Sequence, residues 1–362
     1  MTAHDGLKLI AFYLPQFHPI PENDAWWGKG FTEWRNVAKG RPLFRGHYQP
    51  HLPADLGFYD LRLEDTRIAQ AELARAHGIN GFCYYHYWFN GRELLERPFN
   101  EVLRSRQPDF PICLCWANEN WTRRWDGLDH DVLLGQNYSR EDDRAHIRSL
   151  FPAFEDSRYL RIDGKPLFLV YRVGLFPEPR ATAELWREEA SKAGIGEIFL
   201  ASVESIGVRK TPMDTGFDAA VEFAPDWFVK GDPINQGLFP RLVRKFGHKD
   251  FRRYNVYSYD SLVENMLAKP LPGYKQFRGV APSWDKTARR QGQADMWLGS
   301  TPEKYQAWLS HVIEQTRTRL PSGEQFVFIN AWNEWAEGCH LEPDQKYGRA
   351  YLEATLRARL GG

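Results

Sequence analysis

The chain has 362 residues, and its lysines and arginines together number 47, the same as its aspartates and glutamates. This balance excludes the basic surface of a nucleic-acid-binding protein and provides no attraction to an anionic membrane. The length suits one α/β barrel with long loops, and a hydrophobic share of 43% can fill its core. Aromatic residues make up 15% of the chain, with 14 tryptophans, and flat aromatic faces edged by polar groups favour a sugar ligand.

Short apolar runs alternate with longer amphipathic stretches along the chain, and the apolar runs are typical of buried strands. Strands are expected at residues 9–14, 81–87, 112–116, 167–171, 198–203, 219–223, 279–282 and 326–331. Helices are expected at 63–77, 92–106, 142–154, 181–193, 262–268, 302–319 and 349–360. The alternation predicts a single domain over residues 1–362, a (β/α)8 TIM barrel with extended loops, with a doubly wound open sheet as the alternative.

Residues 226–276 form a long segment between the sixth and seventh expected strands, and we interpret it as an insertion whose basic stretches are a solvated face. The first residues lack the basic and apolar regions of a signal peptide, and no apolar run reaches the length of a membrane span. The four cysteines show no metal-type pairs. We therefore expect a cytoplasmic protein with reduced thiols and no stable membrane insertion.

Polar and aromatic residues gather just past the carboxyl end of each expected strand, where the catalytic groups of such barrels lie. The amino-terminal ends show no similar enrichment. A carbohydrate substrate is therefore expected at this rim. The candidate substrate-binding residues are Tyr13, His18, Tyr85, His86, Trp88, Trp116, Asn118, Glu119, Trp121, Glu204, Glu222, Trp284, Asp285, Trp332 and Asn333.

Glu334 and Glu337 are three residues apart at the end of the last expected strand. Hydrolysis of a glycosidic bond needs a proton donor and a second carboxylate, and these two side chains can converge if the chain turns helically after Trp335. Gly338 allows the turn, and Trp332 and Trp335 are expected to wall the site and desolvate the carboxyls. Two surface glutamates at the start of a helix are the alternative interpretation.

No metal or cofactor site is expected from the sequence. His18 and His86 are interpreted as histidines that hold a sugar hydroxyl. His47 and His51 are four apart, but Pro50 prevents the helix that would put them on one face. The run Asp129-His130-Asp131 is similar to the Asp-x-Asp pair with which many sugar-nucleotide transferases hold a divalent cation, although such a tripeptide is common by chance.

Residues 12–18, 81–89, 115–127 and 331–338 together resemble the WbsX-type family, which is grouped with glycoside hydrolase family 99-like domains. The resemblance covers nearly the whole chain, from Leu9 to about Tyr351. It implies a metal-independent (β/α)8 barrel related to retaining endo-α-mannosidases. It also implies that Glu334 is the base that deprotonates the sugar's 2-hydroxyl, which then attacks the anomeric carbon. Glu337 would be the acid for the leaving oxygen and later the base for water.

Three functions are compatible with these residues. The first is an endo-acting, retaining glycoside hydrolase of a bacterial polysaccharide or related glycan. The second is a glycosyltransferase of lipopolysaccharide or O-antigen biosynthesis, which would need a sugar-nucleotide site. The third is a non-catalytic glycan-binding barrel, which would have no need of paired carboxyls.

Overall fold

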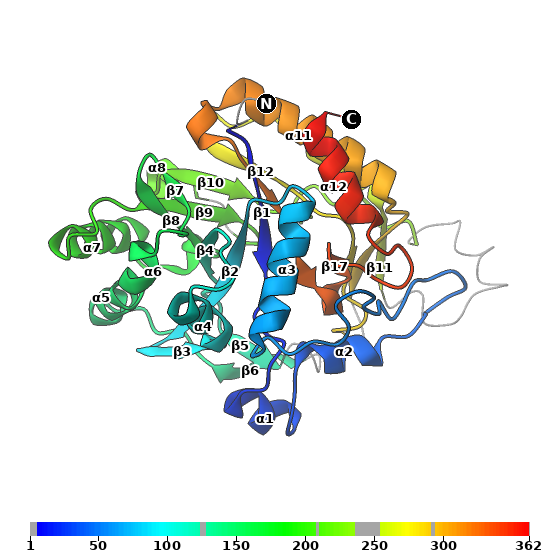
Figure 1. Ribbon diagram of the computed structural model, residues 1–362, viewed down its shortest axis with the longest axis horizontal. Coiled ribbons are helices and arrows are strands. Elements are labelled where there is room, and N and C mark those ends of the chain that lie inside the picture. The colour runs from blue at the N-terminus through cyan, green and yellow to red at the C-terminus, as the bar shows by residue number, and fades with distance from the viewer. Residues whose placement is uncertain (1–5, 124–127, 208–209, 236–253, 291–293, 362) are drawn as a thin grey trace.

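Eight parallel strands form a closed barrel in the computed structural model, which describes residues 6–123, 128–207, 210–235, 254–290 and 294–361 (Figure 1). The strands are β1 (Lys8–Tyr13), β2 (Gly81–Phe89), β4 (Ile112–Trp116), β8 (Lys165–Val170), β9 (Phe199–Glu204), β10 (Ala219–Glu222), β12 (Gln276–Val280) and β15 (Phe326–Ile329). β1 closes the ring, because it pairs in parallel with both β15 and β2. The predicted (β/α)8 barrel is confirmed.

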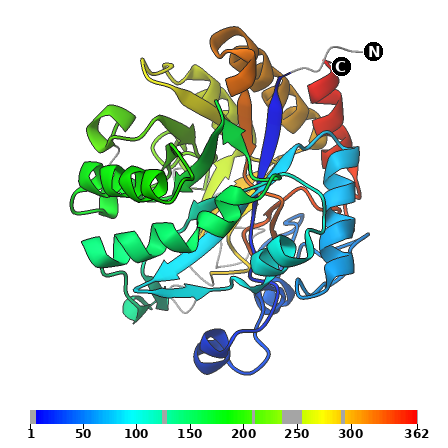
Figure 2. The ribbon, with the colours of Figure 1, turned by 60° about the vertical axis from the view of Figure 1, so that its left-hand side comes forward.

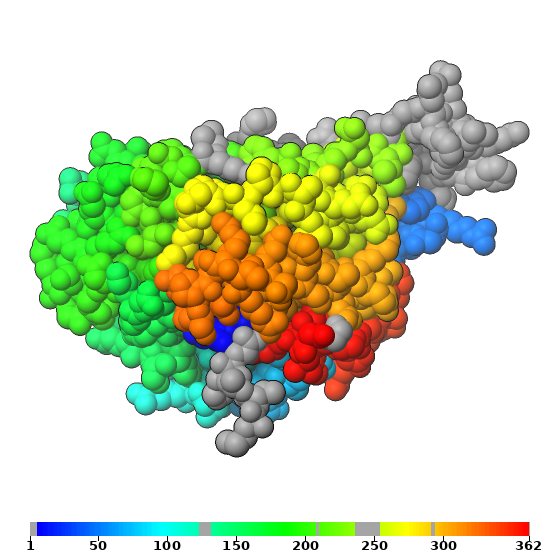
Figure 3. All heavy atoms as spheres, turned by 90° about the horizontal axis from the view of Figure 1, so that it is seen from above, coloured from blue at the N-terminus to red at the C-terminus, as the bar shows by residue number. Residues whose placement is uncertain are grey.

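Helices cover the outside of the barrel, so the strands are buried on both faces and consist of nearly continuous apolar runs. They are α3 (Glu64–Ala76), α4 (Arg97–Ser105), α5 (Arg140–Ser149), α6 (Phe151–Glu155), α7 (Pro179–Lys192), α8 (Pro212–Thr215), α10 (Tyr259–Ala268), α11 (Pro302–Arg319) and α12 (Ala350–Leu360). Figure 2 shows α5 and α7 running alongside one another, and Figure 3 shows α11 (orange) between the yellow segment that contains α10 and α12 (red).

Two of the expected helices are not continuous. Residues 92–106 form the short strand β3 (Arg92–Leu94), which pairs with β2, and then α4. Residues 142–154 belong to α5 and α6. Pro98 lies in the first turn of α4 and Pro152 in the first turn of α6, since a proline lacks the N–H that an interior helical position must donate.

The loops that follow the strands build the mouth of the barrel. Figure 1 shows β1 running toward α1 (Pro21–Trp27) and α2 (Glu33–Lys39), while the start of β1 and the end of α12 lie at the opposite end. The other mouth elements are the hairpin of β5 (Trp121–Arg123) with β6 (Leu128–Leu134), the sheet of β11 (Asn255–Ser258), β14 (Asp295–Leu298) and β13 (Trp284–Asp285), and the pair β16 (Asn333–Glu334) and β17 (Cys339–His340). Minor elements elsewhere are β7 (Arg161–Ile162), η2 (Val173–Leu175) and η4 (Ser322–Glu324).

The segment 226–276 contributes β11 and α10 to this arrangement. Its basic stretches at 241–245 and 252–253 lie outside the described residues. The four cysteines are buried and unbridged. Among the helices that the structure describes, none has both the length and the apolar character needed to cross a membrane.

Candidate active site

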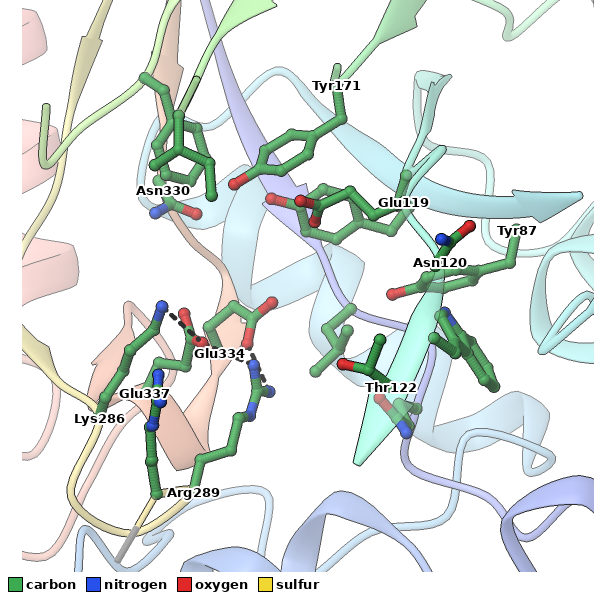
Figure 4. A pocket seen from close by; sticks show the side chains of 18 of the residues that line it. Tyr87, Glu119, Asn120, Thr122, Tyr171, Lys286, Arg289, Asn330, Glu334 and Glu337 are labelled. Carbon is green, nitrogen blue, oxygen red and sulfur yellow. Dashed lines mark hydrogen bonds and ion pairs between the residues drawn. The ribbon is translucent and has the colours of Figure 1, made fainter. Parts of the chain in front are cut away.

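A cavity of about 530 Å³ opens at the carboxyl ends of the barrel strands (Figure 4). Aromatic side chains from strand β2 and from the segments that follow other strands line it: Trp26, Trp27, Tyr85, Tyr87, Trp121, Tyr171, Phe223, Trp227 and Trp284. Trp26 meets Trp121 edge-on at 5.7 Å, and Trp227 meets Trp284 edge-on at 5.5 Å. Flat apolar walls with polar groups between them are suited to a ligand that has apolar faces and many hydroxyls.

Glu334 and Glu337 both line this cavity. Glu334 ends β16, and the chain then makes one turn of 3-10 helix, η5 (Trp335–Glu337), so the turn expected after Trp335 is present. Gly338 ends the turn with φ 55, and a Cβ there would lie 3.0 Å from the Cβ of Asp285. A glycine is therefore required at this position for both conformation and space.

One arginine joins the two glutamates. Arg289 Nη1 donates to Glu337 Oε1 at 2.7 Å, and Arg289 Nη2 donates to Glu334 Oε2 at 2.9 Å. Its Nε donates to Glu33 Oε1 at 2.7 Å, and Glu33 is fully buried at the start of α2. Lys286 adds a second cation, with Nζ 3.4 Å from Glu337 Oε1. Because one guanidinium contacts both carboxyl groups, the two groups must lie near each other. The catalytic carboxyl groups of a glycosidase are also close together, about 5 to 9.5 Å apart.

The two glutamates have pKa values shifted in opposite directions. Burial raises the pKa of Glu334 to about 7, and the neighbouring charge of Glu337 adds to the rise, although Arg289 opposes it. Burial also disfavours the charged form of Glu337, but Lys286 and Arg289 together outweigh it and lower its pKa. Below pH 7 and above the pKa of Glu337 the pair therefore holds about one proton, carried by Glu334, and sharing one proton in this way is how two carboxyls divide acid and base roles.

The loop with Lys286 and Arg289 is fixed by Asp285. His47 Nδ1 accepts from the Leu43 N–H at 3.0 Å, so its Nε2 donates to Asp285 Oδ2 at 2.7 Å. The other oxygen, Oδ1, accepts from the backbone N–H and the hydroxyl of Thr287. Asp285 thus positions the cations and does not line the cavity.

Alternation along the strands decides which of the predicted binding residues reach the cavity. In β2, Tyr85 and Tyr87 line it, while His86 and Trp88 point outward. His86 Nε2 lies 2.9 Å from His146 Nε2, in the layer between the strands and α5. Successive side chains of a strand face opposite sides, so a run of polar and aromatic residues divides between the cavity and the helical layer.

Other predicted residues also lie outside the cavity. Trp116 packs edge-on against His146, and Trp332 packs on Phe82. The Tyr13 hydroxyl donates to Gln70 at 2.7 Å, in the layer between β1 and α3. Trp335 also lies behind the site, stacked on His340 at 3.8 Å. The expectation that Trp332 and Trp335 wall the site was therefore wrong, and other parts of the fold bury the glutamates.

Several more predicted residues hold the wall of the cavity together. Asn118 joins two loops by bonds to the backbone of Arg172 and to Tyr138, and Asn333 bonds the backbone of Leu14 in both directions. The ring of His18 is anchored on the carbonyl of Pro15.

Two carboxylates that were predicted to bind substrate instead pair with other side chains of the protein and do not line the cavity. Glu204 accepts from Tyr274 and Gln276, and Glu222 is paired with Lys269 and Arg278. Of the fifteen predicted binding residues, those that line the cavity are Tyr85, Glu119, Trp121 and Trp284.

Sequence reasoning missed the cations and one carboxylate. Arg289 and Glu33 are 256 positions apart, and neither belongs to a recognisable motif. The adjacent pair Trp26-Trp27, in a polar segment after the first strand, was a legible signal. The side chains of Asp129-His130-Asp131 lie outside the described part of the chain.

The chain is 49% identical over 350 residues to "Uncharacterized protein WxcX" from two strains of Xanthomonas campestris pv. campestris, a match that covers 97% of this chain. It spans 49% of the length of those relatives.

Two solved structures are similar over almost the whole chain, and at their low identity they show the fold alone. A "Glycoside hydrolase-like protein" has a TM-score of 0.60 at 12% identity and covers 99% of this chain and 95% of its own. The GH99 endo-alpha-mannosidase from Bacteroides thetaiotaomicron has a TM-score of 0.56 at 16% identity, with 98% and 96% covered. Residues 9–355 match the family described as "Glycosyltransferase WbsX", and the chain therefore belongs to that family.

Proposed function

We propose that this protein is a retaining, endo-acting glycoside hydrolase of a bacterial polysaccharide or a related glycan. The observation that carries the proposal is the arrangement of Glu334 and Glu337 on one guanidinium, at the floor of a cavity with aromatic walls. A pure binding protein has no need to bury two carboxyls there, because burying charge costs free energy. α-Mannosides are the first substrates to test, since the endo-alpha-mannosidase named above has the same fold.

Glu334 acts as the base in this proposal. Its pKa of about 7 suits a reaction near neutral pH, where such a general base combines adequate strength with adequate ionisation. It takes the proton of the sugar's 2-hydroxyl, or attacks the anomeric carbon itself. Either step produces retention after water completes the second displacement.

Glu337 donates the proton to the leaving oxygen. In the ligand-free protein Lys286 and Arg289 favour its charged form, so the proton must reach it when the glycan enters. A sugar that separates Lys286 Nζ from Glu337 Oε1, now 3.4 Å apart, and excludes water would raise the pKa of Glu337. Substrate binding then moves the one proton of the pair toward the leaving group.

Transfer of a sugar from an activated donor is the second candidate. Lys286, Arg289 and Arg290 all line the cavity, and such cations can neutralise the diphosphate of a sugar nucleotide. The family's description also favours this activity. Release of a nucleoside diphosphate from a sugar nucleotide, in place of new reducing ends from a glycan, would identify it.

A glycan panel tests the hydrolase proposal. Bacterial polysaccharides and α-mannans are incubated with the wild-type protein, and mass spectrometry and NMR follow the products and the anomer released first. We expect oligosaccharides of retained configuration. Glu334→Gln and Glu337→Gln should abolish their release, while Glu314→Gln, an exposed residue on α11, should not change it. Full activity of either site variant would remove that residue from the mechanism.

A further inference from the structure

Three side chains of the types that bind metal ions lie close together near the turn that carries Glu334 and Glu337. They are His51, His340 and Asp344. All three are buried, and one ligand atom from each lies within 4.8 Å of the other two. None of them lines the glycan cavity. We propose that this cluster binds a structural zinc ion, separate from the chemistry of the glycan site.

His340 and Asp344 already have the outer contacts that orient metal ligands. His340 Nδ1 lies 3.0 Å from the backbone carbonyl of Glu342 and can only donate to it, so Nε2 carries the lone pair. Asp344 Oδ1 accepts from two backbone N–H groups, those of Lys346 and Tyr347, while Oδ2 faces His340 Nε2 at 3.9 Å. In metal sites the second ring nitrogen of a histidine ligand usually donates to a carbonyl or a carboxylate. A carboxylate ligand is usually held by hydrogen bonds to its oxygens.

The spacing of the three ligand atoms suits a tetrahedral ion. His51 Nδ1 lies 2.9 Å from His340 Nε2, and the Asp344 oxygen lies 3.9 Å from the same nitrogen. Ligands bound to zinc at about 2.0–2.1 Å in a tetrahedron are separated by roughly 3.3 Å, which falls between these two distances. Two imidazoles and one carboxylate are a donor set that zinc accepts, with one position left for water.

The charge of the cluster also favours a cation. Asp344 is 3% exposed, and among the residues that the structure describes no lysine or arginine forms an ion pair with it. A buried carboxylate is normally paired with a cation or bound to a metal. A zinc ion would supply the missing positive charge.

The place of the cluster gives the ion a task. His51 belongs to the loop after α2, and His340 follows Glu337 by three residues and stacks on Trp335. A zinc ion would therefore clamp the turn that carries Glu334 and Glu337 to a loop far away in the sequence. The ion would stabilise the fold without contacting the glycan.

Metal analysis of the full chain tests this inference, with any affinity tag removed. After chelation and dialysis, the protein is loaded with Zn²⁺ or Co²⁺ alone. We expect one zinc per chain by mass spectrometry, a higher thermal midpoint on zinc addition, and the visible absorption bands of tetrahedral cobalt. Asp344→Asn keeps the backbone-accepting oxygen but should weaken binding at least about tenfold, and His51→Gln should do the same.

His311→Gln, on the exposed surface of α11, is the matched control and should bind zinc like the wild type. The proposal would be overturned if the wild-type protein showed no bound metal, no cobalt bands and no thermal shift. The 2.9 Å contact would then be a hydrogen bond that His51 donates to His340. Equal zinc binding by the wild type and both ligand variants would overturn it too, because the ion would then sit elsewhere. The wild-type measurement decides the matter even if a variant fails to fold.

Discussion

The ionisation of Glu334 makes a stability prediction that needs no substrate. Its folded pKa is about 7, against 4.5 for the ordinary carboxyl. A group whose pKa is raised on folding stabilises the folded state fully below its unfolded pKa, and this contribution is lost as the pH rises through the folded value. The protein should therefore lose stability between about pH 4.5 and 7 because of this one side chain.

The size of the effect follows from the shift. At about 1.36 kcal/mol per pH unit, the rise from 4.5 to about 7 amounts to roughly 3 kcal/mol above pH 7. Glu334→Gln removes the charge but keeps the shape, and Arg289 retains its contacts with Glu33 and Glu337. At pH 8.5 this variant should be more stable than the wild type by up to about 3 kcal/mol, and at pH 5 most of that advantage should vanish.

Urea unfolding followed by tryptophan fluorescence at the two pH values measures the difference. Glu337→Gln is the opposing variant, because the pKa of Glu337 is lowered. Its charged form stabilises the folded protein above the unfolded pKa, and this is lost as the pH falls through the folded value, so the variant should be less stable at pH 8.5. An equal change in stability at both pH values for Glu334→Gln, or a change in the same direction for both variants, would contradict the opposite pKa shifts of the two glutamates.

Three other predictions concern activity and packing. The value of kcat/KM should fall as the pH rises through about 7, because the carboxyl pair must hold one proton. In a pH-rate profile Lys286→Met should move this fall in kcat/KM to higher pH, because Lys286 lowers the pKa of Glu337. Arg289→Met should abolish turnover. It should also lower the free energy of unfolding by about 3–5 kcal/mol in urea, since it leaves Glu33 buried without its partner. A loss of stability below about 1 kcal/mol would contradict this ion network. Trp121→Ala should raise KM about tenfold by removing a cavity wall. Trp88→Ala should instead lower the free energy of unfolding by about 3–5 kcal/mol and leave KM unchanged. The opposite pattern would contradict the placement of Trp121 in the cavity and of Trp88 in the helical layer.

The barrel was predictable because its strands are buried on both faces. Runs such as 112–116 and 326–329 are continuous and apolar, and helical stretches separate most of the apolar runs. The start of α11 was equally legible, since Thr301 caps the helix and Pro302 occupies its first turn. Local chemistry of this kind needs no knowledge of distant contacts.

The candidate site was only partly predictable, for two different reasons. The outward direction of His86 and Trp88 follows from alternation with Tyr85, and that information was in the sequence. The contact of Arg289 with Glu33 was not, because it joins two loops that only the closed barrel brings together. Non-local ion pairs have no periodicity, so they emerge only from the folded chain.

The most direct test of the glutamate pair is a crystal structure of Glu337→Gln with an oligosaccharide that the wild type cleaves. We expect the glycosidic oxygen to lie within hydrogen-bond reach of the residue 337 amide, about 2.6–3.2 Å, and the neighbouring 2-hydroxyl to lie within the same reach of Glu334. A glycan bound in the cavity with neither atom near these side chains would contradict this expectation.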